Sequence, residues 1–367
     1  MKKRTYVKYS DIEKLQEQYN PNFIILYGGR NDGKSYAAKE KVLRDFFHDG
    51  STFTYLRRYS VDIKDVDNRD YWTDFITDTT GRGNKITELS GGLYNDIECE
   101  KNKIYLALTD NEKTTRGPLI GYIHALSAEG RLKSLQFPDV ETIIYEEFCS
   151  TSFLYNEVTH FMNYVSTICR DRRITVLLIG NTITRQNVFF REWELNNIDN
   201  QQPGTVDIYR FKQDAGEVIV AAYYTCTTKD NNMFFGQAAK MITGGEWESQ
   251  EQPHLSDNES MYNEIYRMTF ETDQLNRFLM RFLINEKGDM GLWYVTKRTS
   301  EIKPNERIIS PDLKESALYT ADFFPLSQNE QRLFQYIKMG RIAYGDNLTG
   351  TEFKRAMKQL SFINNSI

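Results

Sequence analysis

The sequence has little of what marks secreted, metal-binding or membrane-spanning chains. Its four cysteines lie far apart and form no Cys-x-x-Cys pair, which argues against a zinc ribbon and against a secreted disulfide framework. The most apolar runs, 23–27 and 176–179, are too short to span a bilayer. The basic residues 1–4 are not followed by the apolar segment that a signal peptide needs. We therefore expect a protein of the reducing cytosol that does not enter a membrane.

Proline is scarce, with 8 residues among 367, and neither sign of charge dominates. The 46 basic and 51 acidic residues give a net charge of −5, so any contact with nucleic acid must come from a local basic face. Hydrophobic residues make up 40% of the chain and aromatic residues 13%, which excludes a disordered or fibrous protein. The length favours two domains.

The first two hundred residues alternate short β-branched runs with helical patterns, as expected for an α/β domain with a mostly parallel sheet and helices on both faces. The predicted strands are 23–27, 52–56, 103–107, 142–145 and 174–179, and the predicted helices are 35–47 and 156–169. Polar stretches at 196–204 and 244–254 predict boundaries, giving domains 1–200 and 256–367 with a linker or lid region 201–255. The last domain is predicted to be α+β, with a hairpin at 277–295 and helices at 328–339 and 351–360.

The strongest motif is a phosphate-binding loop of the form G-x-x-x-x-G-K-[ST], placed after an apolar strand and before a helix. Its residues are Gly28, Gly29, Arg30, Asn31, Asp32, Gly33, Lys34 and Ser35, and Tyr36 follows them. Small residues let successive backbone N–H groups face an anion at the positive end of a helix. Lys34 is expected to reach the β- and γ-phosphates of ATP, and the Ser35 hydroxyl to bind Mg²⁺. The alternative is a glycine turn that only caps the helix.

Two adjacent carboxylates, Glu146 and Glu147, end the apolar strand that begins at Val140. Glu146 is expected to hold Mg²⁺, and Glu147 to polarise the water that attacks the γ-phosphate. Asn181 ends another apolar strand, and active sites of open α/β sheets lie beyond the carboxyl ends of the strands, so Asn181 is a candidate γ-phosphate sensor. The alternatives are a solvated acidic strand end for the glutamates and a turn-capping role for Asn181.

Basic residues at 57–58, 131–133 and 170–173 are candidates for a cation that stabilises the transition state of phosphoryl transfer, from the same or a neighbouring subunit. Taken one by one, each is expected more often to be a solvated surface charge. The residues alone do not decide between these interpretations.

With these motifs in place, the chain resembles the DNA-packaging (encapsidation) ATPases of small short-tailed bacteriophages of the phi29 type. The resemblance is carried in order by 23–30, 33–37, 54–59, 133–134, 137–138, 156–158, 170–172 and 180–181. It is specific across about residues 20–185 and weak afterward, apart from the hairpin near 277–295 and the last helices. It implies an ASCE or RecA-like P-loop fold, with Glu146 standing where that family has Asp. It also implies that Arg170 is an arginine finger offered in trans and that Lys133 approaches a neighbouring subunit's nucleotide.

The same resemblance implies a homo-oligomeric, pentameric ring at the portal vertex of a procapsid in the host cytoplasm. That ring drives double-stranded DNA inward at the expense of ATP, with the portal (connector) protein and a packaging RNA as partners. It further implies that the C-terminal domain is a vestigial RNase H-like nuclease that binds nucleic acid. Strands 277–284 and 290–295 carry no carboxylate, whereas a two-metal nuclease needs several that converge, so we expect no nuclease activity.

The C-terminal helices carry six basic residues that are candidates for contacting DNA phosphates: Arg332, Lys338, Arg341, Lys354, Arg355 and Lys358. The alternative is a solvated helix surface. Two other functions remain open from the sequence: a helicase or AAA-like nucleic-acid remodelling ATPase, and a nucleotide-gated scaffold that does not hydrolyse ATP.

Overall fold

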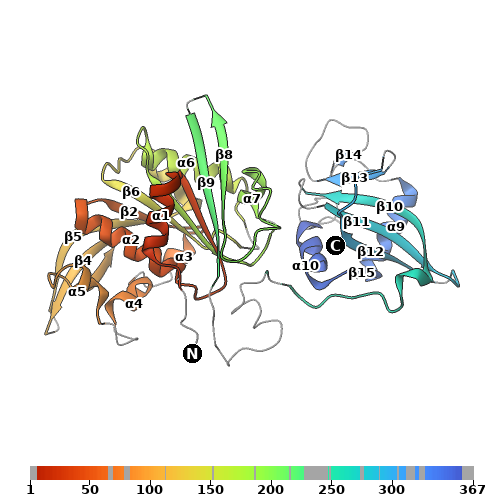
Figure 1. Cartoon of the computed structure of the whole chain (residues 1–367), viewed down its shortest axis with the longest axis horizontal. Helices are drawn as coiled ribbons and strands as arrows, with labels where there is room; N and C mark the ends of the chain where they lie inside the picture. Colours follow the sequence, from red (N-terminus) through yellow and green to blue (C-terminus); the bar gives the residue numbers. More distant parts are fainter. Residues whose placement is uncertain are drawn as a thin grey trace. The chain divides into compact units, whose positions relative to one another are not determined.

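A computed structural model gives the fold. It describes residues 6–64, 69–77, 83–111, 113–150, 153–185, 187–214, 216–226, 247, 249–272, 277–288, 290–303, 306–310, 319–321 and 327–357. The chain divides into two compact units, the first formed by 1–183 and 200–246 and the second by 184–199 and 247–367. Each unit has its own sheet (Figure 1). Among the described residues, no helix is long and apolar enough to cross a membrane.

In the described part of the first unit, the sheet has nine strands, and its centre is parallel. In sheet order the strands are β3 (Asp96–Glu100), β4 (Lys103–Asp110), β5 (Lys113–Ala125), β2 (Thr52–Arg57), β6 (Val140–Glu146), β7 (Thr175–Asn181), β1 (Phe23–Gly28), β9 (Gly216–Thr225) and β8 (Val206–Gln213). Strands β3, β4 and β8 are antiparallel additions at the two edges. β8 and β9, which fall in the predicted linker region, therefore extend the first sheet.

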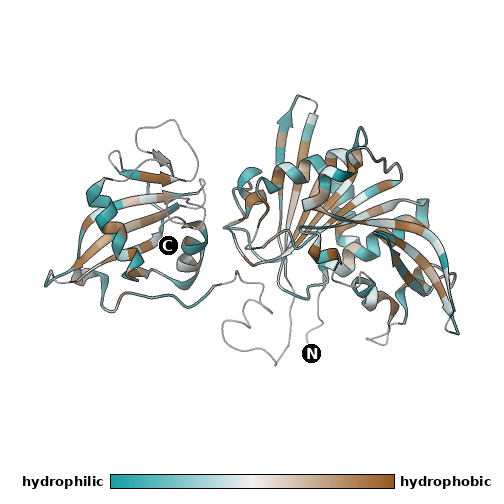
Figure 2. Ribbon diagram, turned by 180° about the vertical axis from the view of Figure 1, so that it is seen from behind, coloured by the Kyte–Doolittle hydropathy of each residue, from teal (hydrophilic) through white to brown (hydrophobic). Residues whose placement is uncertain are grey.

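Helices cover both faces of this sheet. They are α1 (Tyr9–Tyr19), α2 (Lys34–Asp49), α3 (Val61–Lys64), α4 (Thr73–Ile76), α5 (Lys85–Leu89) and α6 (Glu157–Cys169), with the 3-10 helices η1 (Asp70–Trp72) and η2 (Leu126–Leu132). Residues of α1, α2, α4 and α5 share one core with alternate strand residues, whereas α6 stacks Phe161 on Tyr145 on the opposite face. The α/β P-loop architecture predicted from the sequence is confirmed, and Figure 2 shows hydrophobic residues concentrated along the central strands.

The period of two along a strand decides which face each residue meets. Residues two apart in a strand lie on the same face of the sheet. This places Gly28 on the face of Leu26 in β1, Asn181 on the face of Ile179 in β7, and Glu146 on the face of Ile144 in β6. Leu26, Ile179 and Ile144 belong to the core beneath α2. In the sheet, Gly28 pairs with Asn181, and Glu146 pairs with Ile179. The carboxyl ends of β1, β7 and β6 therefore bring Gly28, Asn181 and Glu146, three residues of the predicted site, together on the face of the sheet that α2 covers.

The second unit is α+β, as predicted. The described residues of this unit form six strands, which in sheet order are β14 (Tyr319–Ala321), β13 (Arg307–Ser310), β10 (Tyr262–Glu271), β11 (Arg277–Asn285), β12 (Gly291–Lys297) and β15 (Ile342–Tyr344). Its helices are α7 (Val188–Glu192), α9 (Gln328–Lys338) and α10 (Asn347–Met357), with a 3-10 turn η3 (Glu259–Met261). Phe334 of α9 and Phe353 of α10 join Met268, Met280 and Trp293 in one core.

The predicted hairpin is present, because β11 and β12 are antiparallel with Ile284 opposite Gly291. Helix α10 begins at Asn347, four residues before the predicted start at 351. The reason is local: the Asp346 carboxylate accepts the backbone N–H of Thr349 at 2.8 Å and its hydroxyl at 2.6 Å, which satisfies the first turn.

Candidate active site

The predicted phosphate-binding loop connects β1 to α2, as its sequence requires. Gly33 caps the helix with φ 84°, a left-handed conformation that favours glycine. At Gly28, a Cβ atom would lie 2.1 Å from Thr225 Oγ1, so only glycine fits where β1 passes the end of β9. The backbone N–H groups at the start of the 16-residue helix α2 follow this loop, which makes the site suited to an anion.

Lys34 is nearly buried, and its amine lies among oxygen atoms at the loop. Nζ donates to the Gly29 carbonyl at 2.6 Å and to Asn181 Oδ1 at 3.4 Å, and it lies 3.7 Å from Asp32 Oδ2. The structure therefore brings Asn181, selected from sequence only as the end of an apolar strand, to the lysine of the loop. A γ-phosphate bound by Lys34 would lie within reach of this amide.

Asp32 has a partner that the sequence analysis did not identify. Thr225 Oγ1 donates to Asp32 Oδ2 at 2.6 Å, and the Val7 backbone N–H donates to the Asp32 carbonyl at 2.9 Å. Both contacts fix the loop from segments distant in sequence. The sequence places Thr225 at the end of a strand, which is the one feature that could have suggested a site residue. The sequence does not show that this strand, β9, pairs with β1, so the contact with Asp32 could not be predicted.

Glu146 lies at the end of β6 against the start of α2. Its carboxyl group accepts a hydrogen bond from the Tyr71 hydroxyl at 3.0 Å. Burial raises the pKa of Glu146 above its ordinary value, while the side chains of Ser35 and Tyr71 and the charges of Lys39 and Arg57 oppose that shift. Ser35 and Glu146, the two residues predicted to hold Mg²⁺, thus lie close to one another.

These two side chains fit a magnesium ion chemically. Mg²⁺ prefers oxygen ligands and is usually held by one or two protein groups together with phosphates and water. A hydroxyl and a carboxylate adjacent to a phosphate-binding loop provide that donor set. The residues described in this structure contain no group of three or more His, Cys, Asp or Glu side chains arranged to hold a metal ion.

Glu147 lies just beyond the strand, in a left-handed conformation with φ 57°. Its side chain is 61% exposed, and its Oε2 accepts a hydrogen bond from Arg57 Nη2 at 3.0 Å. Arg57 ends β2, the strand that pairs with β6. The sequence analysis grouped Arg57 with Arg58 as possible phosphate contacts, whereas the structure shows Arg57 paired with Glu147.

Arg58 points to the other face of the sheet and supports the turn that carries Glu147. Its guanidinium donates to the carbonyls of Glu147 and Phe148 and forms two bonds with Glu157, whose side chain is fully buried. The Tyr145 hydroxyl and the Leu154 backbone N–H also donate to Glu157, at 2.7 and 2.8 Å. A buried, fully bonded ion pair therefore fixes the backbone around Glu147.

Arg170 and Lys133 are not part of this constellation within the chain. Arg170 is exposed in the turn that precedes β7, and its Nη2 donates to the Leu135 carbonyl at 3.0 Å. The seven residues of β7 separate this turn from Asn181, a length of roughly 20 Å. Lys133 is exposed two residues before Leu135. The length of β7 therefore keeps Arg170 away from the phosphate loop of its own subunit in this structure.

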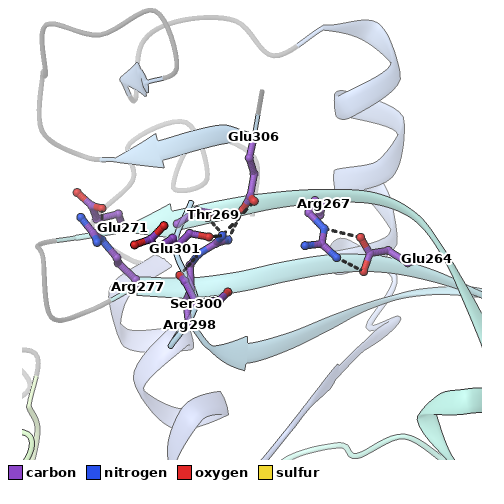
Figure 3. A network of polar contacts seen from close by, with 9 residues as sticks. All are labelled: Glu264, Arg267, Thr269, Glu271, Arg277, Arg298, Ser300, Glu301 and Glu306. Atoms are coloured by element: carbon purple, nitrogen blue, oxygen red, sulfur yellow. Dashed lines mark hydrogen bonds and ion pairs between the residues drawn. The ribbon is translucent and has the colours of Figure 1, made fainter. Parts of the chain in front are cut away.

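The second unit has a buried polar network, drawn in Figure 3. Arg298 and Glu306 form an ion pair in which each side chain is 1% exposed, and Thr269 donates to Glu306 at 2.6 Å. Glu271, also buried, pairs with Arg277, and Glu264 pairs with Arg267. Each of these three glutamates therefore forms an ion pair with an arginine, and the arginine charge balances the charge of the carboxylate.

Comparison with known proteins gives matches to phage DNA packaging proteins. Residues 82–203 match the family model described as Podovirus DNA encapsidation protein (Gp16). The chain is similar to the DNA packaging protein of Bacillus phage phi29, with 28% identity over 174 residues, which is 46% of this chain and 45% of that protein. The DNA packaging protein of Bacillus phage B103 gives 28% identity over the same length. The chain thus aligns with less than half the length of these relatives.

A chain in a solved structure of the bacteriophage Phi-29 viral genome packaging motor assembly shares the fold, with a TM-score of 0.53. The superposition covers 95% of this chain and 98% of that one at 18% identity, so it includes both units. The comparisons thus confirm the resemblance predicted from the sequence, to the DNA packaging proteins of phages of the phi29 type.

Proposed function

We propose that this protein is the ATPase subunit of a viral motor that moves double-stranded DNA into a procapsid. The observation that carries the proposal is the convergence of Lys34, Ser35, Glu146, Glu147 and Asn181 at the carboxyl edge of the first sheet, in a chain similar to phage DNA packaging proteins. The motor would be a ring, pentameric in our proposal, that acts at the portal vertex in the host cytoplasm. A packaging RNA is a further proposed partner.

In this mechanism the loop and the start of α2 bind the phosphates of ATP, and Lys34 contacts the β- and γ-phosphates. Ser35 and Glu146 would hold Mg²⁺, which, when bound, neutralises charge on the phosphate oxygens. Glu147 orients and polarises the attacking water, and Asn181, at the end of β7, contacts the γ-phosphate and senses whether it is present. Arg57 donates a hydrogen bond to one oxygen of the Glu147 carboxylate in this structure, so Arg57 competes with the attacking water for Glu147.

Arg170 and Lys133 are proposed to act on the nucleotide of a neighbouring subunit. Their exposure, and the length of β7 between Arg170 and its own loop, support a role in trans. A cation that enters from the next subunit would complete the site only in the assembled ring. ATP binding and hydrolysis can then shift each subunit interface between two states. The free energy available for this shift is no more than the difference in nucleotide binding free energy between the two states.

We further propose that the second unit contacts nucleic acid and does not cleave it. The pairing of Glu264, Glu271 and Glu306 with arginines supports the absence of cleavage. Arg332, Lys338, Arg341 and Lys354 are exposed and Arg355 is half-buried, as phosphate contacts would allow, and Lys358 lies outside the described residues.

The decisive experiment compares Glu147→Gln with Lys34→Ala and the unaltered protein. Glu147→Gln should bind ATP but lower hydrolysis by about a hundredfold or more, because the amide cannot accept the proton of the attacking water. Lys34→Ala should lose binding as well. Unchanged hydrolysis in Glu147→Gln would remove that residue from the mechanism, and absence of ATP binding by the unaltered protein would refute the ATPase.

A mixing experiment tests the shared site. Rings of Arg170→Ala alone, or of Glu147→Gln alone, should be inactive. In mixed rings, the intact Glu147 of an Arg170→Ala subunit meets the intact Arg170 of a Glu147→Gln subunit, so some hydrolysis should return. No recovery in rings whose assembly is verified would contradict a role of Arg170 in trans.

DNA translocation into procapsids, rather than unwinding of free duplex, distinguishes the motor from a helicase.

A further inference from the structure

The side chain of Tyr71 contacts the carboxylate proposed to hold the metal ion. Tyr71 belongs to η1, in the segment between β2 and β3, far in sequence from both the phosphate loop and β6. Its hydroxyl donates to Glu146 Oε1 at 3.0 Å. Ser35, at the start of α2, lies close to the same carboxyl group, so Glu146 has α2 on one side and η1 on the other.

The Tyr71 ring and backbone are themselves firmly placed. The ring lies 4.4 Å from that of Tyr55 between centroids, and the following residue, Trp72, is fully buried. Lys39 of α2 donates its Nζ proton to the Tyr71 carbonyl at 2.6 Å, lies 4.6 Å from the centre of the Tyr71 ring, and forms an ion pair with Asp74. These contacts tie η1 and α4 to the helix that begins at the phosphate loop.

Glutamate has one more rotatable bond than aspartate, so its carboxylate can adopt more positions at the end of a strand. A donor that holds one oxygen removes part of this freedom before the metal binds. Lys34 and Ser35 precede Lys39 on α2, so the same helix carries the phosphate-loop residues and the lysine that anchors η1. Loop, metal-binding carboxylate and η1 thus form one connected arrangement.

We propose that Tyr71 is a positioning residue that orients Glu146 for the metal ion of a bound nucleotide. This inference rests on the proposed ATPase function. The phenol acts through the glutamate: it holds one carboxylate oxygen and leaves the other free for the metal ion. Removing the phenol oxygen should therefore weaken metal binding, while the contacts of the loop with the phosphates stay intact.

The test uses full-length protein and Tyr71→Phe, which keeps the packed ring and removes only the donor. Tyr164→Phe is the matched control, because Tyr164 is buried and its hydroxyl bonds His124 at 2.8 Å. Calorimetry with the non-hydrolysable analogue AMP-PNP, at increasing Mg²⁺, separates metal-dependent from metal-free nucleotide binding. Electron paramagnetic resonance of bound Mn²⁺ measures the metal directly. Tyr71→Phe should weaken metal affinity about tenfold and leave metal-free binding unchanged. Tyr164→Phe should change neither affinity.

A second background makes the test specific for the Tyr71–Glu146 contact. Aspartate at 146 withdraws the carboxylate from the phenol, so Tyr71→Phe in the Glu146→Asp protein should change metal affinity less than twofold. Equal metal affinity of Tyr71→Phe and unaltered protein would overturn the inference, and so would a tenfold loss in both backgrounds. If Tyr71→Phe lowers the melting temperature, the double variant still provides the test. A loss of metal affinity caused by reduced stability would also occur in the Glu146→Asp protein, whereas a loss caused by the missing contact with Glu146 would not. By contrast, an unaltered protein that binds no AMP-PNP at any Mg²⁺ concentration would refute the proposed ATPase itself.

Discussion

The buried ion pair between Arg58 and Glu157 provides a quantitative test of how the turn around Glu147 is held. Glu157 has a side chain with no exposed surface, and it accepts four hydrogen bonds from Arg58, Tyr145 and Leu154. Replacing Glu157 by Ala leaves Arg58, only 6% exposed, without its counter-charge. Breaking a buried pair in this way costs about 3–5 kcal/mol of unfolding free energy.

An exposed ion pair in the same unit is the control. Glu217 accepts a bond from Arg210 at 2.6 Å between β8 and β9, but these side chains are 38% and 48% exposed. Glu217→Ala should therefore destabilise the unit by less than about 1 kcal/mol. Both substitutions remove a glutamate from an ion pair of similar N···O distance, so their difference measures the burial of Glu157 together with its additional hydrogen bonds.

Hydrogen exchange of the β6 amides, residues 140–146, gives the readout, because a central strand exchanges through the larger openings of its unit. Since about 1.4 kcal/mol corresponds to a factor of ten, exchange in Glu157→Ala should accelerate roughly a hundredfold to several thousandfold. Glu217→Ala should accelerate it less than about sixfold. Hydrolysis should fall in Glu157→Ala with ATP affinity retained, because Arg58 holds the carbonyls of Glu147 and Phe148. Equal exchange rates in the two variants would refute the reasoning.

Three further predictions follow from named contacts. Arg57→Ala releases Glu147 from an exposed pair worth at most about 1 kcal/mol, so basal ATP hydrolysis should rise up to about fivefold; a loss of hydrolysis in steady-state assays would instead assign Arg57 to the phosphates. Burial lowers the pKa of His124 to about 4, so the native state binds fewer protons than the unfolded chain below pH 6.5. The free energy of unfolding should therefore fall as the pH drops from 6.5 to 4; urea titrations should show a shallower fall in His124→Gln, and an unchanged slope would contradict this. Arg298→Met leaves Glu306 buried without a cation and should destabilise the second unit by about 3–5 kcal/mol, measured by hydrogen exchange of β11. Arg267→Ala, in a half-buried pair with Glu264, is the control, and similar exchange in both variants would show that burial of the Arg298 pair does not matter.

Much of the site could be predicted from local sequence because its chemistry is local. The spacing of Gly28, Gly33 and Lys34 between an apolar strand and a helix specifies a phosphate loop, and an apolar strand that ends in Glu146 specifies where a carboxylate will lie. The alternation of strands and helices also predicts that the carboxyl ends of the strands meet at one edge. These inferences need only periodicity, turn chemistry and the direction of parallel strands.

The remaining features depend on contacts between segments distant in sequence, which no local pattern encodes. Thr225 meets Asp32 because β9 pairs with β1, and Tyr71 meets Glu146 because Trp72 and Lys39 fix η1 on the sheet. Arg57 and Arg58 are neighbours in the chain, yet the strand period sends one to Glu147 and the other to Glu157 on the opposite face. The sequence by itself predicted which groups could bind phosphate and metal; the tertiary structure decided which side chains hold those groups in place, because strand order and packing set those distances.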